Sequence, residues 1–600
     1  MARPLARLRL ACTLVVLALA CRPPAPPAEP TPVVESPAEA PKDPWSSPPA
    51  IDAAALRAHL TFLADDAQEG RSPGTEADRR VQDHIEAAMR SLGLEPAFGG
   101  AYRQPFEVTD GIRPRDGAPS VLTLGKAALP HAMLPFGHDT ADAPPIEAEL
   151  IFVGHGIAPE GPKTGDYTAL GDKVRGKIAV VLTGAPNDPH LSPAATRPQS
   201  KVIAARDHGA VGVILVDPES DLPFPNHGQV TDLQIPVVAV TKAQAPALFA
   251  ALGARKGSPK PGARSRVKAR LATPFTPVVL TTANVGGVLR GGGDDGRRIV
   301  LGAHMDHLGF GTSASLAPGA HEIHNGADDN ASGVSTMLAL AAALAQVPPA
   351  SRPYDLVFFA FGAEEMGLLG SKHLVEAIPE AERPHMVAML NFDMVGRLRE
   401  NAVVVAGTGT AKQWPSLLER SAGPLTVRPS DDGYGASDQT SFYEVGVPVL
   451  HFFTGPHDDY HRPSDDLAAI NVDGATAVGG LALRVVGLLM TERPALEYVK
   501  VARPTGTRGG FRVSLGTVPD YAAQVDGVKL SGVRPGGPAE AAGLRAGDVI
   551  VRIGDRDIHN LDDYMASFAA LQPGVEVIVT VLRESDRVDL RLTPAASRGR

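Results

Sequence analysis

Cysteine is scarce in this chain of 600 residues, which contains only Cys12 and Cys21. Cys12 lies in an N-terminal segment that we expect to be removed, so the mature chain keeps one cysteine and has no internal disulfide. Stability must therefore come from hydrophobic cores, which suits a large exported protein. The length of 600 residues is too great for one core, and we expect roughly three or four domains.

Positive charge is also in deficit, because 57 Lys and Arg residues stand against 67 Asp and Glu residues, for a formal net charge of -10. A protein that binds nucleic acid through a basic patch is disfavoured, and we expect no nucleic-acid partner. The apolar share of 44% and the charged share of 21% are typical of soluble globular proteins.

The apolar run near the N-terminus, residues 10–20, is too short for a comfortable transmembrane helix. It follows three arginines, and we predict a signal peptide over residues 1–20. The end of the run resembles a bacterial lipobox with Cys21 as the lipidated first mature residue, although Ala18 stands where leucine is usual. We expect a cell-envelope lipoprotein held to a membrane by its lipid, with secretion or a retained anchor as alternatives. Residues 21–50, rich in Pro and Ala, are predicted to be a disordered tether.

One stretch, residues 299–333, contains the residue types of a metal site. An apolar run predicted to be a strand ends at His304 and is followed by Asp306. After a Gly-rich loop, Asp328 and Asp329 stand directly before a helix rich in Ala and Leu. A strand that delivers a His and an Asp, next to a helix start that delivers two carboxylates, indicates the beginning of a metal site.

Strands and helices alternate over residues 273–497, which predicts a mostly parallel sheet with helices on both faces. Ligands of such sheets lie beyond the carboxyl ends of the strands. Four predicted strands end near a His, Asp or Glu, although each motif alone is common in loops and helix caps. Their joint order predicts one metal site at a single sheet edge, formed by His304, Asp328, Glu364, Glu365, Asp393 and His461.

The stretch LTFLADDAQEGRSPGT, residues 60–75, resembles the opening of the M28 family of metallopeptidases. Together with the ordered ligand candidates, the resemblance covers most of residues 60–120 and 275–495. It implies the zinc exopeptidase fold, an α/β fold in which helices sandwich a mixed, mostly parallel sheet. The peptidase domain would then consist of residues 51–145 and 273–497.

The resemblance to co-catalytic zinc aminopeptidases implies two Zn2+ ions, although cobalt or manganese fits the same ligand types. It implies that Glu364 is the general base for the attacking water and then the proton donor to the leaving amine. Asp306 would accept the free N–H of the first histidine ligand and fix its tautomer. The implied ligands are His304 and Asp393 on one ion, Glu365 and His461 on the other, and Asp328 as the bridge.

A further loop, residues 433–442, lies where relatives in that family have a Ser-Asp-His-x-x-Phe sequence near the substrate. Gln439 replaces the histidine here, so the role of that histidine is not carried over. Tyr434 in this loop is a candidate for holding the transition-state oxyanion, with an ordinary loop tyrosine as the alternative.

Residues 146–272 contain short β runs, and motifs at 166–167, 174–181 and 204–213 resemble a protease-associated (PA) domain. This insert contains no cluster of catalytic residue types. The resemblance implies a lid or spacer that shapes substrate access.

The C-terminal region, residues 505–600, resembles a PDZ domain of the bacterial protease-linked type through its AGLRAGDVI motif. Ser514, Leu515 and Gly516 stand where the carboxylate-binding loop of such a domain lies. A peptide or protein C-terminus is therefore a candidate partner, and packing on the catalytic domain is the alternative.

These expectations combine into an exported zinc aminopeptidase that removes N-terminal residues from peptides. Three alternatives stay open: another exopeptidase on the same scaffold, such as a carboxypeptidase or dipeptidase; a glutaminyl cyclase with a single zinc; and a non-enzymatic binding protein built on the PA and PDZ domains. The complete set of five ligand candidates favours the two-metal enzyme.

Overall fold

The computed structural model describes most of the chain from Pro44 onward. The predicted signal peptide, Cys21 and residues 22–43 of the predicted tether lie outside the described residues. Residues 44–50 were also predicted to belong to the tether, but Trp45 packs against the main hydrophobic core and donates to the carbonyl oxygen of Ser351 at 2.8 Å, so the ordered chain begins earlier than predicted. The described residues are 44–157, 166–184, 197–221, 224, 230–312, 314–317, 322–435, 437–501, 513–519, 525–533, 537–560, 563–564, 567–568, 571–584 and 586–596.

A nine-stranded mixed sheet organises the peptidase part of the chain, with strand order β1-β11-β13-β12-β14-β17-β15-β16 and β2 beside β11. At its centre β13, β12, β14 and β17 are parallel neighbours. The bounds are β1 (Glu95–Pro96), β2 (Arg103–Pro114), β11 (Phe275–Leu289), β12 (Arg298–His304), β13 (Asp355–Phe361), β14 (Met386–Phe392), β15 (Ala402–Ala406), β16 (Thr426–Ser430) and β17 (Val449–Phe453).

The central strands are continuous apolar runs because both faces of the sheet are covered. Along β13, Phe358 and Ala360 belong to the hydrophobic core on one face, whereas Val357, Phe359 and Phe361 belong to the core on the other. This is the alternation of a strand, in which successive side chains point to opposite faces. The predicted α/β fold with a mostly parallel central sheet is confirmed.

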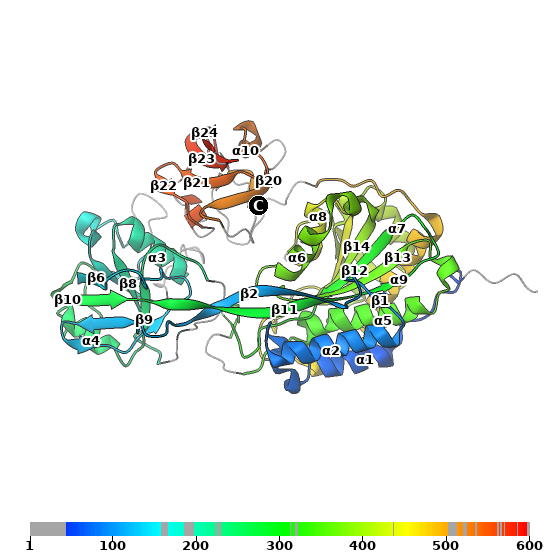
Figure 1. The fold of residues 1–600 in the computed structure, drawn as a ribbon, viewed down its shortest axis with the longest axis horizontal. Helices are drawn as coiled ribbons and strands as arrows, with labels where there is room; N and C mark the ends of the chain where they lie inside the picture. Colours follow the sequence, from blue (N-terminus) through cyan, green and yellow to red (C-terminus); the bar gives the residue numbers. More distant parts are fainter. Residues whose placement is uncertain are drawn as a thin grey trace, which may run out of the picture. The chain divides into compact units, whose positions relative to one another are not determined.

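Helices cover both faces of this sheet (Figure 1). The first face carries α1 (Ala53–Leu63), α2 (Glu76–Ser91), α5 (Gly333–Ala345), α7 (Trp414–Ser421) and α9 (Val472–Glu492), and the second carries α6 (Leu369–Ala377) and α8 (Gln439–Glu444). Helix α9 is long and apolar enough to cross a membrane, but 67% of its most apolar window is buried. It packs against α5 and α1 and is therefore a core helix.

A second sheet lies between β2 and β11 in the sequence and has the order β4-β3-β10-β6-β7-β8-β9-β5. Its first three strands, within residues 121–133, were predicted to belong to the peptidase domain, and the structure corrects that boundary. Strand β3 pairs with β10, almost 150 residues later, and local sequence does not reveal such a long-range pairing. The bounds are β3 (Val121–Leu124), β4 (Ala127–Ala128), β5 (Ala132–Met133), β6 (Ile146–Gly154), β7 (Ile178–Leu182), β8 (Gly212–Val216), β9 (Val237–Val240) and β10 (Arg264–Ala272), with helices α3 (Pro198–Asp207) and α4 (Ala245–Ala251).

The C-terminal part has a six-stranded sheet and a separate strand pair around its own hydrophobic core. Leu515 is buried in that core, and Gly516 has a φ of 75°, so the loop predicted to bind a carboxylate turns between β18 and β19. The bounds are β18 (Val513–Ser514), β19 (Thr517–Pro519), β20 (Val528–Val533), α10 (Pro538–Ala541), β21 (Val549–Ile553), β22 (Arg556–Asp557), β23 (Val577–Arg583), β24 (Asp586–Leu592) and β25 (Ala595–Ala596).

Candidate metal centre

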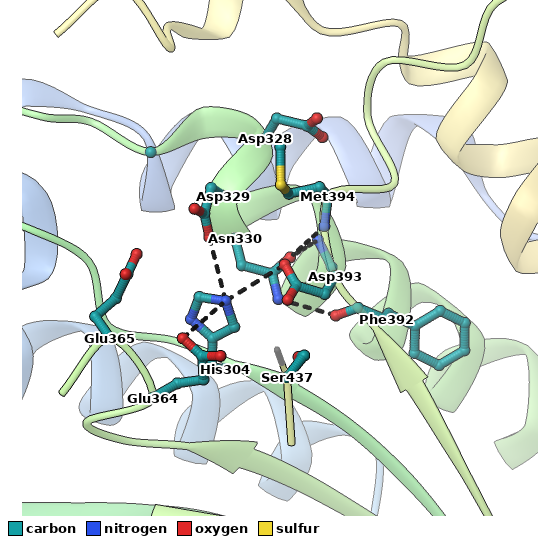
Figure 2. Close-up of polar contacts among 12 residues, drawn as sticks. His304, Asp328, Asp329, Asn330, Glu364, Glu365, Phe392, Asp393, Met394 and Ser437 are labelled. Carbon is teal, nitrogen blue, oxygen red and sulfur yellow. Dashed lines mark hydrogen bonds and ion pairs between the residues drawn. The ribbon is translucent and has the colours of Figure 1, made fainter. Parts of the chain in front are cut away.

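The carboxyl ends of the four central parallel strands bring the predicted ligands to one edge of the large sheet. His304 is the last residue of β12, and Asp393 directly follows β14. Glu364 and Glu365 lie just after β13, and His461 lies in the loop after β17. Figure 2 shows the part of this edge around His304.

The first group of potential ligands consists of His304, Glu364 and Asp393, which are all buried. His304 Nε2 lies 3.4 Å from Asp393 Oδ1 and 3.9 Å from Glu364 Oε2. One imidazole nitrogen therefore faces two carboxylates, which is a donor set that suits zinc.

The second group of potential ligands consists of His307, Asp329 and Glu365, and His461 lies beside it. His461 Nε2 lies 3.1 Å from Glu365 Oε2. On the other side of the same ring, His461 Nδ1 lies 3.0 Å from the carbonyl oxygen of Ala314. Because a carbonyl only accepts hydrogen bonds, Nδ1 carries the hydrogen, and Nε2 is the nitrogen left for a cation.

The carboxylate that joins the two groups belongs to Asp329. Its Oδ1 lies 3.2 Å from His304 Nε2, and its Oδ2 lies 3.3 Å from His461 Nε2. The N–H of Asp329 donates to the carboxylate of Asp465 at 3.0 Å, which fixes the backbone at this position. One side chain thus presents one oxygen to each group, as a bridging ligand does.

Asp328 was predicted to be the bridge, and the geometry differs from that prediction. Its side chain points away from His304, whereas that of Asp329 points toward it (Figure 2). Asp328 Oδ1 accepts hydrogen bonds from the N–H of Gly396 at 2.6 Å and from Ser332 Oγ at 3.0 Å, and its Oδ2 lies 3.2 Å from His457 Nε2. Adjacent side chains diverge along the chain, so only one of two successive aspartates faces the site.

Asp306 holds the loop that carries the two glutamates. Its carboxylate accepts the backbone N–H of Glu364 at 3.0 Å and that of Glu365 at 3.2 Å. The expected contact with His304 is looser, because Asp306 Oδ1 lies 3.9 Å from His304 Nδ1 while its carbonyl oxygen lies at 3.3 Å. The residue therefore positions both the strand-end histidine and the glutamate loop, chiefly the latter.

The buried acids and histidines at this edge shift one another's pKa values strongly. Burial raises the pKa of Glu364 well above its usual value, and the neighbouring carboxylate of Glu365 raises it further. Burial alone would raise the pKa of Asp329, but its contacts with His304 and His461 hold that pKa well below the usual range. Clustered acids of perturbed pKa at strand ends are typical of functional sites.

Buried atoms without a hydrogen-bond partner show that the donor set fits metal ions. Among the described residues, the buried atoms His461 Nε2 and Asp393 Oδ1 have no hydrogen-bond partner of good geometry. Each lies at one of the two groups and has a lone pair to offer. A buried polar atom without a partner is costly, and a cation between imidazole and carboxylates removes that cost.

The sequence prediction missed Arg71, whose guanidinium is buried and holds the ligand loops through backbone carbonyls. It donates to the carbonyl oxygens of Leu63 at 2.8 Å and Met305 at 2.9 Å, and to that of Gly326 at 3.0 Å. It also donates to the carbonyl oxygens of Asn325 and, at 3.4 Å, Asp329. Arg71 lies in the stretch that carries the family resemblance, which was the available signal, but four of its five contacts cross more than 230 residues.

The two tyrosines of the region differ in their relation to the site. The ring of Tyr434, the predicted oxyanion residue, packs edge-on against Tyr443 at 4.8 Å between ring centroids. The ring of Tyr460 stacks on that of His461 at 3.8 Å. Burial raises the pKa of Tyr460, and the nearby carboxylates of Asp329 and Glu365 raise it further. Tyr460, which was not singled out from the sequence, is therefore the tyrosine beside the ligand groups.

We expect Arg71→Met to unfold at lower denaturant concentration, with a loss of about 3 kcal/mol in the free energy of unfolding, because buried carbonyls lose their donor. Urea unfolding followed by circular dichroism measures this loss. Arg57→Met, an exposed change on α1, serves as the control and should unfold within about 0.5 kcal/mol of the unaltered protein. Equal stability of the two variants would contradict the role assigned to Arg71.

Comparisons with known proteins agree with this geometry. Residues 284–486 match the model of Peptidase family M28, residues 146–248 that of the PA domain, and residues 508–593 that of the PDZ domain. The chain is 27% identical over 429 residues to Aminopeptidase YwaD of Bacillus subtilis, covering 69% of this chain and 80% of the relative. It is 25% identical over 468 residues to Probable lipoprotein aminopeptidase LpqL of Mycobacterium tuberculosis, covering 70% of this chain and 82% of the relative.

A solved structure has the same fold. The zinc aminopeptidase BSAP from Bacillus subtilis aligns with a TM-score of 0.50 and 24% sequence identity, over 73% of this chain and 94% of that one. The family model, the relatives and the order of residues along the sheet edge lead to the same assignment. Residues 284–486 form a domain that matches peptidase family M28, and the chain also contains a PA domain and a PDZ domain.

Proposed function

We propose that the protein is a zinc aminopeptidase that uses two metal ions to hydrolyse the N-terminal peptide bond of its substrates. The observation that carries the proposal is the carboxylate of Asp329, which offers one oxygen to each of two groups of ligands. The relatives named aminopeptidases, matched over about four fifths of their own lengths, support the activity. A glutaminyl cyclase would bind a single zinc ion, so that activity would not account for the second group of potential ligands.

The proposed ligands differ in one position from those inferred from the sequence. When bound, the zinc ions supply Lewis-acid activation of water and stabilise the negative charge of the transition state. Imidazole nitrogens and carboxylate oxygens are ligands that zinc accepts. The proposed sets are His304 and Asp393 at the first ion, Glu365 and His461 at the second, and Asp329 at both.

Glu364 is the proposed general base and acid. Its backbone is fixed by the carboxylate of Asp306, and its own carboxylate lies beside His304 without being required as a ligand. A carboxylate of raised pKa is well matched to take a proton from the attacking water and to return it to the leaving amine. Tyr460, stacked over His461, would contact the substrate near the scissile carbonyl in place of Tyr434.

Export and anchoring through Cys21 remain part of the proposal. The signal sequence pattern supports it, and one relative is named a probable lipoprotein. The domain limits are proposed as 51–120 and 273–497 for the peptidase and 505–600 for the PDZ domain, with the PA insert between the two peptidase segments. We also propose that the loop of Ser514, Leu515 and Gly516 binds the C-terminus of a peptide or protein.

Removal of metal should abolish activity. We expect the purified protein to release p-nitroaniline from aminoacyl anilides, to stop after dialysis against a chelator and to recover when zinc is added. A pair of peptides blocked at one end or the other checks the polarity of cleavage. Cleavage only of the N-terminally blocked peptide would show a carboxypeptidase instead.

The change Glu364→Gln should leave zinc content unchanged and lower kcat by roughly 100- to 10,000-fold, because the amide accepts no proton from water. Zinc measured by mass spectrometry and initial rates on the same sample test this. Glu376→Gln on α6, an exposed glutamate of the same domain, is the control for the substitution itself. A Glu364→Gln enzyme with full turnover would remove the base assignment.

The two successive aspartates can be separated by matched substitutions. Asp329→Asn should bind fewer than two zinc ions per chain after dialysis, because the bridging charge is lost. Asp328→Asn should retain both ions, since an amide oxygen still accepts the hydrogen bonds of Gly396 and Ser332. The reverse pattern of zinc contents would restore Asp328 as the bridge.

A further inference from the structure

His307 is a buried histidine at the second group of ligands that the proposed chemistry does not use. Its side chain has no exposed surface, and its Nδ1 lies 2.7 Å from Glu365 Oε1. The other oxygen of the same carboxylate, Oε2, lies 3.1 Å from His461 Nε2. Glu365 is therefore shared, with one oxygen facing His307 and the other facing the nitrogen left for a cation.

The ring of His307 is itself fixed in place. Its backbone N–H donates to the carbonyl oxygen of Arg71 at 3.3 Å. The ring packs directly on Gly326, where a Cβ would come within 2.5 Å of His307 Cγ, so any side chain there would displace the ring. Gly326 also has a φ of 53°, a conformation that glycine adopts without strain. The ring is held by the same backbone segments that position Asp329.

The hydrogen-bond geometry assigns a tautomer to this ring. An ionised carboxylate only accepts hydrogen bonds, so Nδ1 carries the hydrogen and donates it to Glu365 Oε1. Nδ1 is therefore engaged by Glu365, whereas Nε2, which is buried without a hydrogen-bond partner among the described residues, keeps its lone pair. His307 can act on the second ion through Glu365, and direct ligation through Nε2 is the rival role that the test separates from it.

We propose that His307 is a positioning residue that holds Glu365 as a one-oxygen ligand and thereby raises the affinity of the second metal site selectively. A carboxylate with one oxygen engaged by an N–H donor has lost the freedom to rotate away or to bind a cation through both oxygens. At the first site, the described residues include no histidine N–H that holds the second oxygen of Asp393 in this way, and its Oδ1 faces His304 Nε2 at 3.4 Å. The inference rests on the proposed two-ion site.

The test uses an isosteric pair of substitutions. Leucine and asparagine have nearly the same shape, but only the asparagine amide places an N–H donor near the position of Nδ1. We expect His307→Leu to lower the affinity for the second zinc ion by roughly 10- to 100-fold, while the first ion binds as before. His307→Asn should recover most of that affinity. Zinc binding is measured by competition with a chelating dye, without reference to activity.

A control and a second readout separate the alternatives. His385→Leu, a change at a partly exposed histidine outside the site, should bind both ions as the unaltered protein does. In the cobalt-loaded protein, His307→Asn should leave the visible absorption bands unchanged if the ring is not a ligand. Altered bands, or equal loss of the second ion in the Leu and Asn variants, would overturn the positioning role in favour of direct ligation.

The remaining results of these experiments also distinguish the possible roles of His307. If the Leu variant does not fold, the Asn variant and its cobalt spectrum still decide between the two roles. If both variants bind the second ion as tightly as the unaltered protein, His307 only fills space and the inference is wrong. If the unaltered protein binds fewer than two ions, the proposed function fails before this inference is reached.

Discussion

The concentration of buried negative charge at one sheet edge is the constraint on which the rest of this structure depends. Asp306, Asp329, Glu364, Glu365 and Asp393 are all shielded from water within one small volume. Carboxylates this close repel one another, and burial makes each charge more costly. The surrounding chain compensates by supplying imidazoles, backbone N–H groups and a buried guanidinium. Bound zinc would complete that compensation, because a cation offsets the mutual repulsion of the carboxylates.

Much of this edge could be predicted because the position of each residue at a strand end follows from the neighbouring sequence. A parallel strand is an apolar run, and the residue that ends it must lie at the carboxyl edge, so the placement of His304, Asp393 and the pair Glu364 and Glu365 at this edge could be predicted from the sequence. The family prediction is confirmed by the matching models. The choice between Asp328 and Asp329 was not local, because it depends on how the chain turns into α5.

The supporting residues could not be predicted for a different physical reason. Arg71 acts on carbonyl oxygens, which every residue possesses, so no pattern of side chains marks its partners. His307 is one of several histidines in a glycine-rich loop, and its importance follows from a contact with Glu365 that only the folded sheet creates. The start of the second sheet at β3 escaped prediction because strand pairing across a long separation leaves no period in the sequence.

The pairing of β2 with β11 has a consequence for how such a chain can be assembled. Pro114 lies opposite Phe275, so all of residues 115–274 form an excursion between two paired positions of a hairpin. The entropic cost of closing a loop grows with the logarithm of its length, by about 0.6 kcal/mol for each doubling, so even a loop of this length is closed at a moderate extra cost. A folded insert also brings its own ends together and reduces the cost further. The hairpin of β2 and β11 therefore accommodates a whole additional domain at a moderate cost in loop-closure entropy.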